Sequence, residues 1–271
     1  MSPGTALRLT GRDALALLHR TTSNALADLG RGEARATLFC DFRGRLLHRA
    51  VVALTGDGAV WLLRDDAPGA ELAAAVDRTV FRDDVRIEDR SGELPVVLVR
   101  ALPGESAGLE EADGVPRAVR TGDGTALRVG GGEPLGERAR IALLHPRHGH
   151  EIAEAFNPFE VGLAHEVHLA KGCFTGQEAL QRLITYDSVR RRPVHVRLLG
   201  PAPPVPAEVV SAGGAPGGAG SVGVLTSVAG EDGLAVVRRD TIGAGGTLAL
   251  AGGTPLAVVA APELARPLGR P

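Results

Sequence analysis

The stretch "AKGCFTGQEAL", residues 170–180, differs most clearly in composition from the rest of the chain. Of 30 Lys and Arg residues only Lys171 is a lysine, and Cys173 is one of 2 cysteines. The chain's only glutamines, Gln177 and Gln181, follow at once. Lysine differs from arginine in being a compact charge whose pKa can shift. A lone lysine beside a thiol therefore indicates a functional pair.

The residues after Cys173 predict the start of a helix. Thr175 and Glu178 have the spacing of a capping box, in which each side chain binds a backbone N–H of the first turn. The apolar positions that follow share one helical face, which predicts a helix of about three turns to about residue 186. Cys173 would then lie just before a helix N-terminus and near Lys171, and both favour a thiolate.

A purely structural interpretation of the same residues stays open beside the functional one. Gly172 and Gly176 can serve only to allow a tight turn, and the capping box can serve only to begin a helix. Cys173 would then be a small buried hydrophobic side chain, as free cysteines often are.

Length and composition bound the class of protein. A chain of 271 residues with 44% hydrophobic and 23% charged residues is typical of a soluble globular protein of two domains, or of one domain with an appendage. The net charge of −2 gives no global field that would attract nucleic acid or a membrane surface. We expect a cytoplasmic protein, because we see no secretory signal, membrane span or disulfide framework. The Ala-, Gly- and Arg-rich composition suggests a bacterial origin.

Periodicity along the chain predicts an α+β fold. We expect helices over about 13–22 and from Pro68 onward, strands at 84–90 and 94–102, and hairpins about the Gly-Asp-Gly turns at 51–64 and 118–129. The short β-type runs after Pro193, separated by Gly and Pro, predict a small antiparallel barrel or sandwich. The predicted domains are residues 1–192, with an α+β subdomain at about 51–130, and residues 193–271.

Other motifs carry weaker signals. Histidines gather in "HPRHGHE" (145–151) and "HEVH" (165–168), but the latter has the spacing i, i+3 rather than the i, i+4 of a helical zinc site, so we predict no metal site. The run "RRRP" (190–193) is basic but lacks the aromatic residues of a nucleic-acid surface. The sequence contains no GxxxxGK[ST] P-loop, and its "GGG" run at 130–132 lacks a GxGxxG frame.

The octapeptide "KGCFTGQE" (171–178) resembles the KGC-aromatic-x-GQE signature of the folate-binding YgfZ-type family. These proteins are relatives of the glycine-cleavage aminomethyltransferase and support iron–sulfur cluster proteins. Further resemblances fall in the same order along the chain: "LRLTGRDALALLHRTTSN" (7–24), "FCDFRGRLL" (39–47), "NPFEVGL" (157–163) and "VGVLTS" (222–227).

The resemblance implies a ring of three subdomains with tetrahydrofolate bound at the centre and a small C-terminal β-barrel. It assigns the family's functional thiol to Cys173, with Lys171 as the second candidate catalytic residue. The remaining motif positions are Gly172, Phe174, Thr175, Gly176, Gln177, Glu178 and Arg182. The implied partners are folate and iron–sulfur client or assembly proteins, while the folate-contacting residues stay unidentified.

Two departures separate this chain from the aminomethyltransferases it resembles. The acidic pair of those enzymes, which follows a Gly-containing segment, is replaced by His48 and Arg49. A glutamate that they use for the pterin is replaced by Ala142. An aminomethyltransferase that needs those carboxylates cannot work with His, Arg and Ala in their place.

Three functions stay open at this point. The first is a tetrahydrofolate-binding accessory protein for iron–sulfur cluster assembly or repair, in which Cys173 is an activated thiol. The second is a tetrahydrofolate-dependent aminomethyltransferase, and the third is a non-catalytic folate-binding module. The sequence leaves open whether the thiol acts as a nucleophile, as a transient iron ligand or structurally. We also predict that at least one of Arg190, Arg191 and Arg192 holds the anionic polyglutamate tail of a folate.

Overall fold

The computed structural model describes residues 4–101, 107–212, 220–243 and 247–269, and these form two compact units. The first unit comprises the described residues of Met1–Leu135, Glu166–Gln177 and Pro267–Pro271. The second comprises those of Gly136–His165 and Glu178–Arg266.

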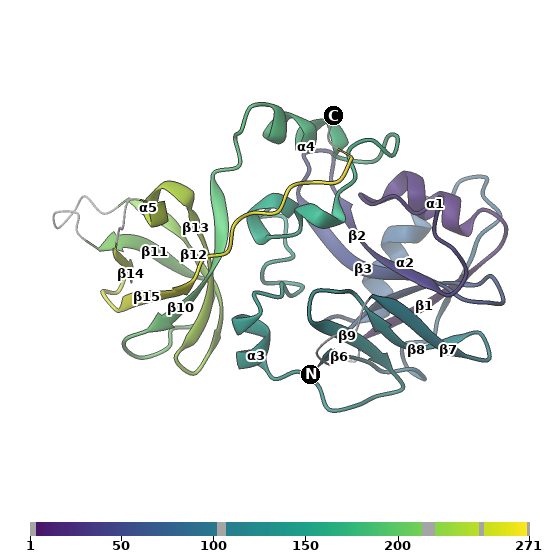
Figure 1. Cartoon of the computed structure of the whole chain (residues 1–271), viewed down its shortest axis with the longest axis horizontal. Helices are drawn as coiled ribbons and strands as arrows, with labels where there is room; N and C mark the ends of the chain where they lie inside the picture. Colours follow the sequence, from purple (N-terminus) through teal and green to yellow (C-terminus); the bar gives the residue numbers. More distant parts are fainter. Residues whose placement is uncertain (1–3, 102–106, 213–219, 244–246, 270–271) are drawn as a thin grey trace. The chain divides into compact units, whose positions relative to one another are not determined.

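The larger sheet of the first unit has the strand order β2-β3-β4-β1-β5, and its described neighbours are all antiparallel. Its strands are β1 (Thr5–Thr10), β2 (Glu33–Cys40), β3 (Leu46–Leu54), β4 (Val60–Arg64) and β5 (Arg86–Asp89). Two helices belong to this part of the chain, α1 (Ala14–Thr21) and α2 (Gly69–Asp77), and both are visible in Figure 1.

Alternation along the central strands gives this sheet two apolar faces. Leu62 of β4 joins the core that contains Leu17 of α1 and Leu72 of α2. Its neighbours Trp61 and Leu63 point to the opposite face and pack with the second sheet. This period of two is what a pleated strand buried on both sides requires.

The smaller sheet of the first unit has the order β6-β9-β8-β7. Its strands are β6 (Val96–Arg100), β7 (Gly108–Ala112), β8 (Val115–Arg120) and β9 (Thr125–Val129). The indole N–H of Trp61 donates to the carbonyl oxygen of Gly114, 3.1 Å away, so this large side chain is both buried and hydrogen-bonded.

The second unit is built around a closed antiparallel barrel with the order β10-β13-β12-β11-β14-β15. Its strands are β10 (Arg191–Leu198), β11 (Ala207–Ala212), β12 (Ser221–Ala229), β13 (Asp232–Arg238), β14 (Thr247–Leu250) and β15 (Pro255–Ala260). The helices of this region are α3 (Glu137–Ala142), α5 (Arg239–Gly243) and the 3₁₀ turn η1 (Pro158–Val161), while η2 (Ala164–Glu166) and α4 (Gln177–Thr185) begin or end at the junctions between the units.

The structure confirms most of the predicted elements. Helices α1 and α2, strand β5 and the barrel lie where the sequence places them, and both Gly-Asp-Gly turns join antiparallel neighbours. Strand β6 occupies most of the predicted run at 94–102, whose last residue lies outside the described residues. The predicted domain boundary at residues 192 and 193 falls inside β10.

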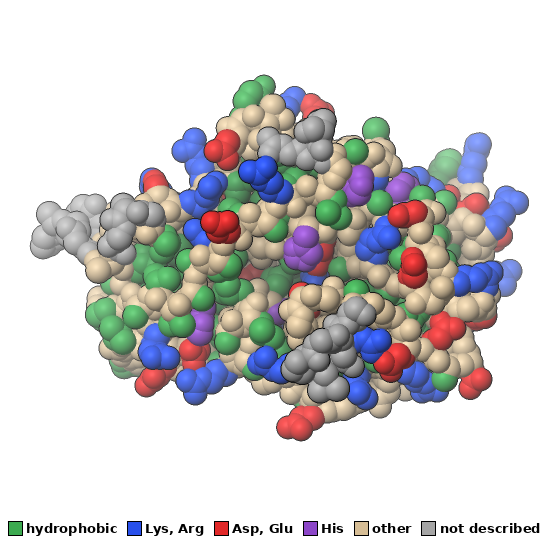
Figure 2. Space-filling view, viewed as in Figure 1, with side chains coloured by type: hydrophobic (Ala, Val, Ile, Leu, Met, Phe, Trp, Pro, Cys, Tyr) green, Lys and Arg blue, Asp and Glu red, His purple; other side chains and the backbone are tan. Residues whose placement is uncertain are grey.

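Two further properties concern the surface and the helices. Figure 2 shows Lys and Arg side chains interspersed with Asp and Glu over the face in view, so the charge on that face is mixed. Among the helices of the described ranges, none combines the length and the hydropathy needed to cross a membrane.

Candidate functional site

The KGCFTGQE motif lies in a loop that its own residues hold in shape. We call residues 169–177 the motif loop. The side-chain amide of Gln177 donates to the carbonyl oxygen of Leu169 at 2.9 Å, which ties the two ends of the loop together. The backbone N–H of Gln177 donates to the carbonyl oxygen of Phe174 at 3.2 Å, and the Phe174 ring is buried.

Gly176 brings the motif loop against the turn between β2 and β3, some 130 residues earlier in the chain. Its φ is +85°, and a Cβ at this position would lie 2.4 Å from the carbonyl oxygen of Asp41 and 3.0 Å from Cα of Gly44. The Asp41 carboxylate shapes that turn by accepting from the backbone N–H groups of Arg43 and Arg45. Glycine is required here because no side chain fits.

Lys171 is held on the other side of the loop by helix α1. Its ammonium group donates to the carbonyl oxygen of His19, and Nζ lies 5.0 Å from the centroid of the Phe174 ring. Partial burial lowers the pKa of Lys171 to about 8, while the charge of the Cys173 thiolate acts in the opposite direction. The charge of Cys173 is thus one of the two influences on the Lys171 ammonium group.

Cys173 is exposed, so the interpretation of this residue as a small buried hydrophobic side chain is wrong. Cys40, in contrast, is buried at the end of β2, and burial raises the pKa of its thiol to about 12. Both cysteines are free thiols. Only Cys173 has the exposure that a reactive thiol needs.

The predicted capping box is wrong. Helix α4 begins at Gln177, so Gly176 and not Thr175 stands at the N-cap position directly before its first turn. The Glu178 carboxylate instead accepts from the guanidinium of Arg182 at 2.5 Å, and both side chains are largely exposed. Among the described residues, the motif loop is therefore held by Gln177, Gly176 and Lys171 rather than by a helix cap.

Arg49 forms a buried ion pair that the sequence did not reveal. Its Nε lies 2.9 Å and 3.1 Å from the two carboxylate oxygens of Glu166, and its Nη2 lies 2.6 Å from Oε1. Glu166 is 2% exposed, and Asp123 approaches the same guanidinium at 3.7 Å. The sequence held one hint of this pair, namely an arginine within a β-strand. A buried arginine needs a carboxylate partner.

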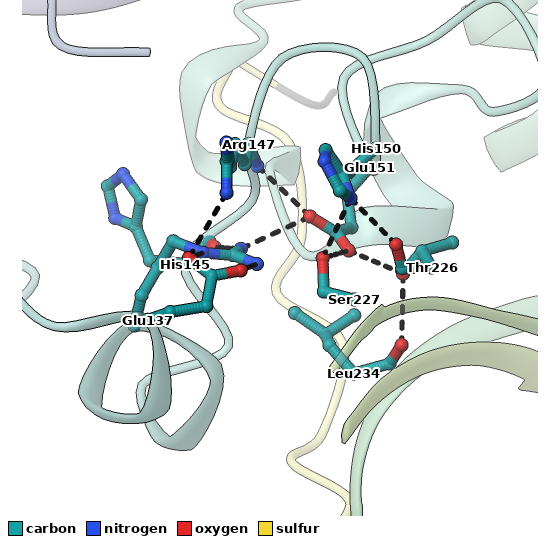
Figure 3. Close-up of polar contacts among 9 residues, drawn as sticks. Glu137, His145, Arg147, His150, Glu151, Thr226, Ser227 and Leu234 are labelled. Carbon is teal, nitrogen blue, oxygen red and sulfur yellow. Dashed lines mark hydrogen bonds and ion pairs between the residues drawn. The ribbon is translucent and has the colours of Figure 1, made fainter. Parts of the chain in front are cut away.

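His145 and His150 belong to a structural network in the second unit, drawn in Figure 3. At its centre is the fully buried carboxylate of Glu151, which accepts from Arg140 at 3.2 Å and from the Ser227 hydroxyl at 2.8 Å. His150 Nδ1 donates to the carbonyl oxygen of Thr226 at 2.7 Å. The network fastens residues 136–165 to strand β12.

The three arginines at 190–192 have different surroundings. Arg191 pairs with Glu160 at 2.7 Å, and Arg192 donates to the carbonyl oxygens of Ala261 and Pro262. Arg190 is exposed, and its guanidinium has no ion pair or hydrogen bond with another described residue. Arg190 is thus the member of the run best placed to meet a ligand.

Known proteins resemble this chain in both of its parts. Residues 190–265 match the family model of the CAF17 C-terminal beta-barrel domain. A chloroplastic protein of Arabidopsis thaliana, named as a transferase, is 32% identical over 150 residues, which cover 52% of this chain and 33% of that protein. The aminomethyltransferase of Streptomyces avermitilis is 28% identical over 220 residues, which cover 64% of this chain and 59% of the enzyme.

Among solved structures, the glycine cleavage system aminomethyltransferase T from Bartonella henselae superposes with a TM-score of 0.73. The superposition covers 94% of this chain and 82% of that one, at 15% sequence identity. The protein therefore has the aminomethyltransferase fold, with a closed antiparallel barrel near its C-terminal end, as predicted. It spans only a third to about three-fifths of the two curated relatives.

Proposed function

We propose that this protein is a tetrahydrofolate-binding accessory factor that supports the assembly or repair of iron–sulfur proteins in the bacterial cytoplasm. Its reactive group is the thiol of Cys173, and Lys171 is the neighbouring cation. The observation that carries the proposal is the contrast within the motif loop, where an exposed Cys173 lies between anchored neighbours.

The anchoring of the motif loop supports this function over a purely structural motif. Lys171 and Gln177 are hydrogen-bonded, and Phe174 is buried. None of these contacts needs a thiol at position 173, since Cys173 faces solvent. A thiolate presented on a fixed loop beside an ammonium group is suited to attack an electrophile or to exchange with another thiol.

Aminomethyl transfer is the less favoured alternative. Arg49 stands where the aminomethyltransferases carry one of their acidic residues, and it engages both carboxylate oxygens of Glu166. The side chain of Ala142, at the end of α3, has no acceptor to offer a pterin. The residues at these positions do not fit a folate held as in those enzymes, so none of the chemistry proposed for Cys173 depends on folate.

Folate binding rests on the fold and on the sequence similarity to an aminomethyltransferase. Within this proposal, the charge of Arg190 supports a binding site for the polyglutamate tail of the folate. We expect Arg190→Ala to weaken binding of polyglutamylated tetrahydrofolate by about threefold without changing that of the monoglutamate, since one exposed charge contributes modestly. Titration calorimetry at low and high salt measures both affinities. Equal binding of the two folates by the unmodified protein would contradict the proposed site for the polyglutamate tail.

The proposed function is tested by deleting the gene in its own host. Activity of a [4Fe–4S] enzyme, normalised to the amount of enzyme protein, should fall and should return when the gene is restored. Unchanged activity of cluster enzymes in the deletion strain would overturn the function. The aminomethyltransferase alternative is tested separately with purified protein, tetrahydrofolate and an aminomethyl donor, where turnover would favour transfer.

A further inference from the structure

His19, in the last turn of α1, is held in one protonation state by its hydrogen bonds. Its Nδ1 accepts from the backbone N–H groups of Leu26 at 2.9 Å and Ala27 at 3.2 Å. Its Nε2 lies 3.2 Å from the carbonyl oxygen of Lys171. A carbonyl oxygen can only accept, so Nε2 carries the proton and the ring is the neutral Nε2–H tautomer.

The link between His19 and Lys171 runs in both directions. The imidazole donates to the backbone carbonyl of Lys171, and the Lys171 ammonium donates to the backbone carbonyl of His19. The two hydrogen bonds to His19 thereby fix both the main chain and the side chain of Lys171, although the two residues are 152 positions apart. Cys173 follows two residues later on the same loop, so the link holds the backbone that leads to the thiol.

We propose that His19 is a positioning residue for Cys173, whose neutral imidazole fastens the motif loop to helix α1 and whose protonation releases it. The inference rests on the proposed function in one respect, namely that Cys173 is a reactive thiol. It adds a residue outside the KGCFTGQE motif and makes the reactivity of the thiol dependent on pH.

Protonation would displace the ring, and the link with it, because it removes the acceptor of Leu26 and Ala27 while Nε2 keeps its proton. A proton on Nδ1 would face the N–H groups of Leu26 and Ala27, donor against donor, and would free both from their acceptor. Burial, followed by the charge of Lys171, lowers the pKa of His19 below its usual 6.5, and His168 acts in the same direction. Asp28 and the bond to the Lys171 carbonyl oppose this shift. The neutral form therefore prevails at neutral pH, and release belongs to the range below 6.5.

Two substitutions separate the two bonds of the ring. His19→Gln keeps a donor at the position of Nε2 but cannot titrate. His19→Asn keeps an acceptor at the position of Nδ1 but cannot reach the Lys171 carbonyl. The rate at which iodoacetamide alkylates Cys173, followed by peptide mass spectrometry, reports the thiolate: a carbon–sulfur bond forms and iodide leaves.

We expect His19→Asn to slow alkylation at pH 7.5 by about tenfold, as for a displaced reacting group. The ratio of the unmodified protein's rate to that of His19→Gln should stay constant above pH 7 and fall by about tenfold between pH 6.5 and 5. This ratio removes the ordinary loss of thiolate in acid. Parallel pH profiles for the unmodified protein and His19→Gln, or full reactivity of His19→Asn, would overturn the role of His19.

A second measurement keeps this outcome apart from failure of the proposed function. If Cys173 of the folded protein reacts no faster than in urea, the proposed function loses its reactive thiol. The link is then tested by nitrogen-15 NMR of the imidazole and of the Lys171 amide. An Nδ1–H tautomer, or a Lys171 amide shift that ignores the titration of His19, would contradict the positioning role.

Discussion

At the scale of single residues, the two thiols of this chain lie in opposite surroundings. Cys40 is buried, and its pKa is raised to about 12, so it stays protonated at neutral pH. Cys173 is exposed and electrostatically coupled to Lys171. Among the two, only Cys173 meets both conditions of a reactive thiol, which are access to solvent and a neighbouring positive charge.

Lys171 should leave a signature in the pH dependence of stability. Burial lowers its pKa from 10.5 in the unfolded chain to about 8 in the folded protein. Between these values the unfolded chain binds more protons, so the free energy of unfolding should rise with pH from about 8 to 10.5. Urea denaturation at several pH values measures this slope. Lys171→Met should remove it, and an unchanged slope in that variant would show that another group is responsible.

The residue scale also shows what a sequence leaves hidden. The lone lysine beside Cys173 was visible from composition, and so was the replacement of acidic residues by His48 and Arg49. The partner of Arg49 could not be predicted, because Glu166 is 117 positions away and lies in the segment "HEVH", which was considered only for its histidines. Only the folded chain brings the two charges together.

At the scale of elements, two turns distant in sequence define the site. The motif loop packs on the turn between β2 and β3 through Gly176, where the backbone of Asp41 leaves no space for a side chain. Both segments lie in stretches that resemble the YgfZ-type family, yet nothing in their sequences indicates that they are in contact. Gly176 also explains why the predicted capping box does not form. Its φ of +85° is not helical, and helix α4 starts only after it.

We expect Gly176→Ala to destabilise the first unit and displace the motif loop. Its Cβ would meet the Asp41 carbonyl at 2.4 Å, and its positive φ adds strain, which together should cost roughly 1–3 kcal/mol. Gly172→Ala is the matched control, because its φ is also positive, at +111°, but a Cβ there meets nothing within 4 Å. Thermal unfolding followed by Trp61 fluorescence compares the two. Equal losses of stability would mean that backbone strain, and not the close approach, makes Gly176 necessary.

In the second unit, the Glu151 network connects elements that are distant in sequence. Glu151→Ala would leave the buried guanidinium of Arg140 without one of its partners and the Ser227 hydroxyl without an acceptor. We expect a loss of about 3 kcal/mol in the free energy of unfolding, measured by urea denaturation with circular dichroism. Glu178→Ala removes an exposed ion pair with Arg182 and should change stability by less than about 0.5 kcal/mol. A small effect of Glu151→Ala would contradict a structural role for the network.

At the scale of the whole molecule, the sequence predicted the α+β class, the barrel and most of the elements, because strands and hairpins leave strong local patterns. It could not predict how the chain is shared between its compact units. Residues 136–165 group with the barrel, while residues 166–177 and the described end of the chain group with the N-terminal sheets. Such long-range exchanges depend on contacts like that of Glu151 with Thr226 and Ser227, which have no local signature.

The most direct test of the account is complementation of the deletion strain with single-residue variants. Cys173→Ser should fail to restore the activity of the [4Fe–4S] enzyme, and Cys40→Ser should restore it, at equal protein levels. Lys171→Arg should restore it only in part, because a guanidinium keeps the charge but lacks the compact form of an ammonium group. Full rescue by Cys173→Ser would contradict the account and would leave the KGCFTGQE motif with a structural role alone.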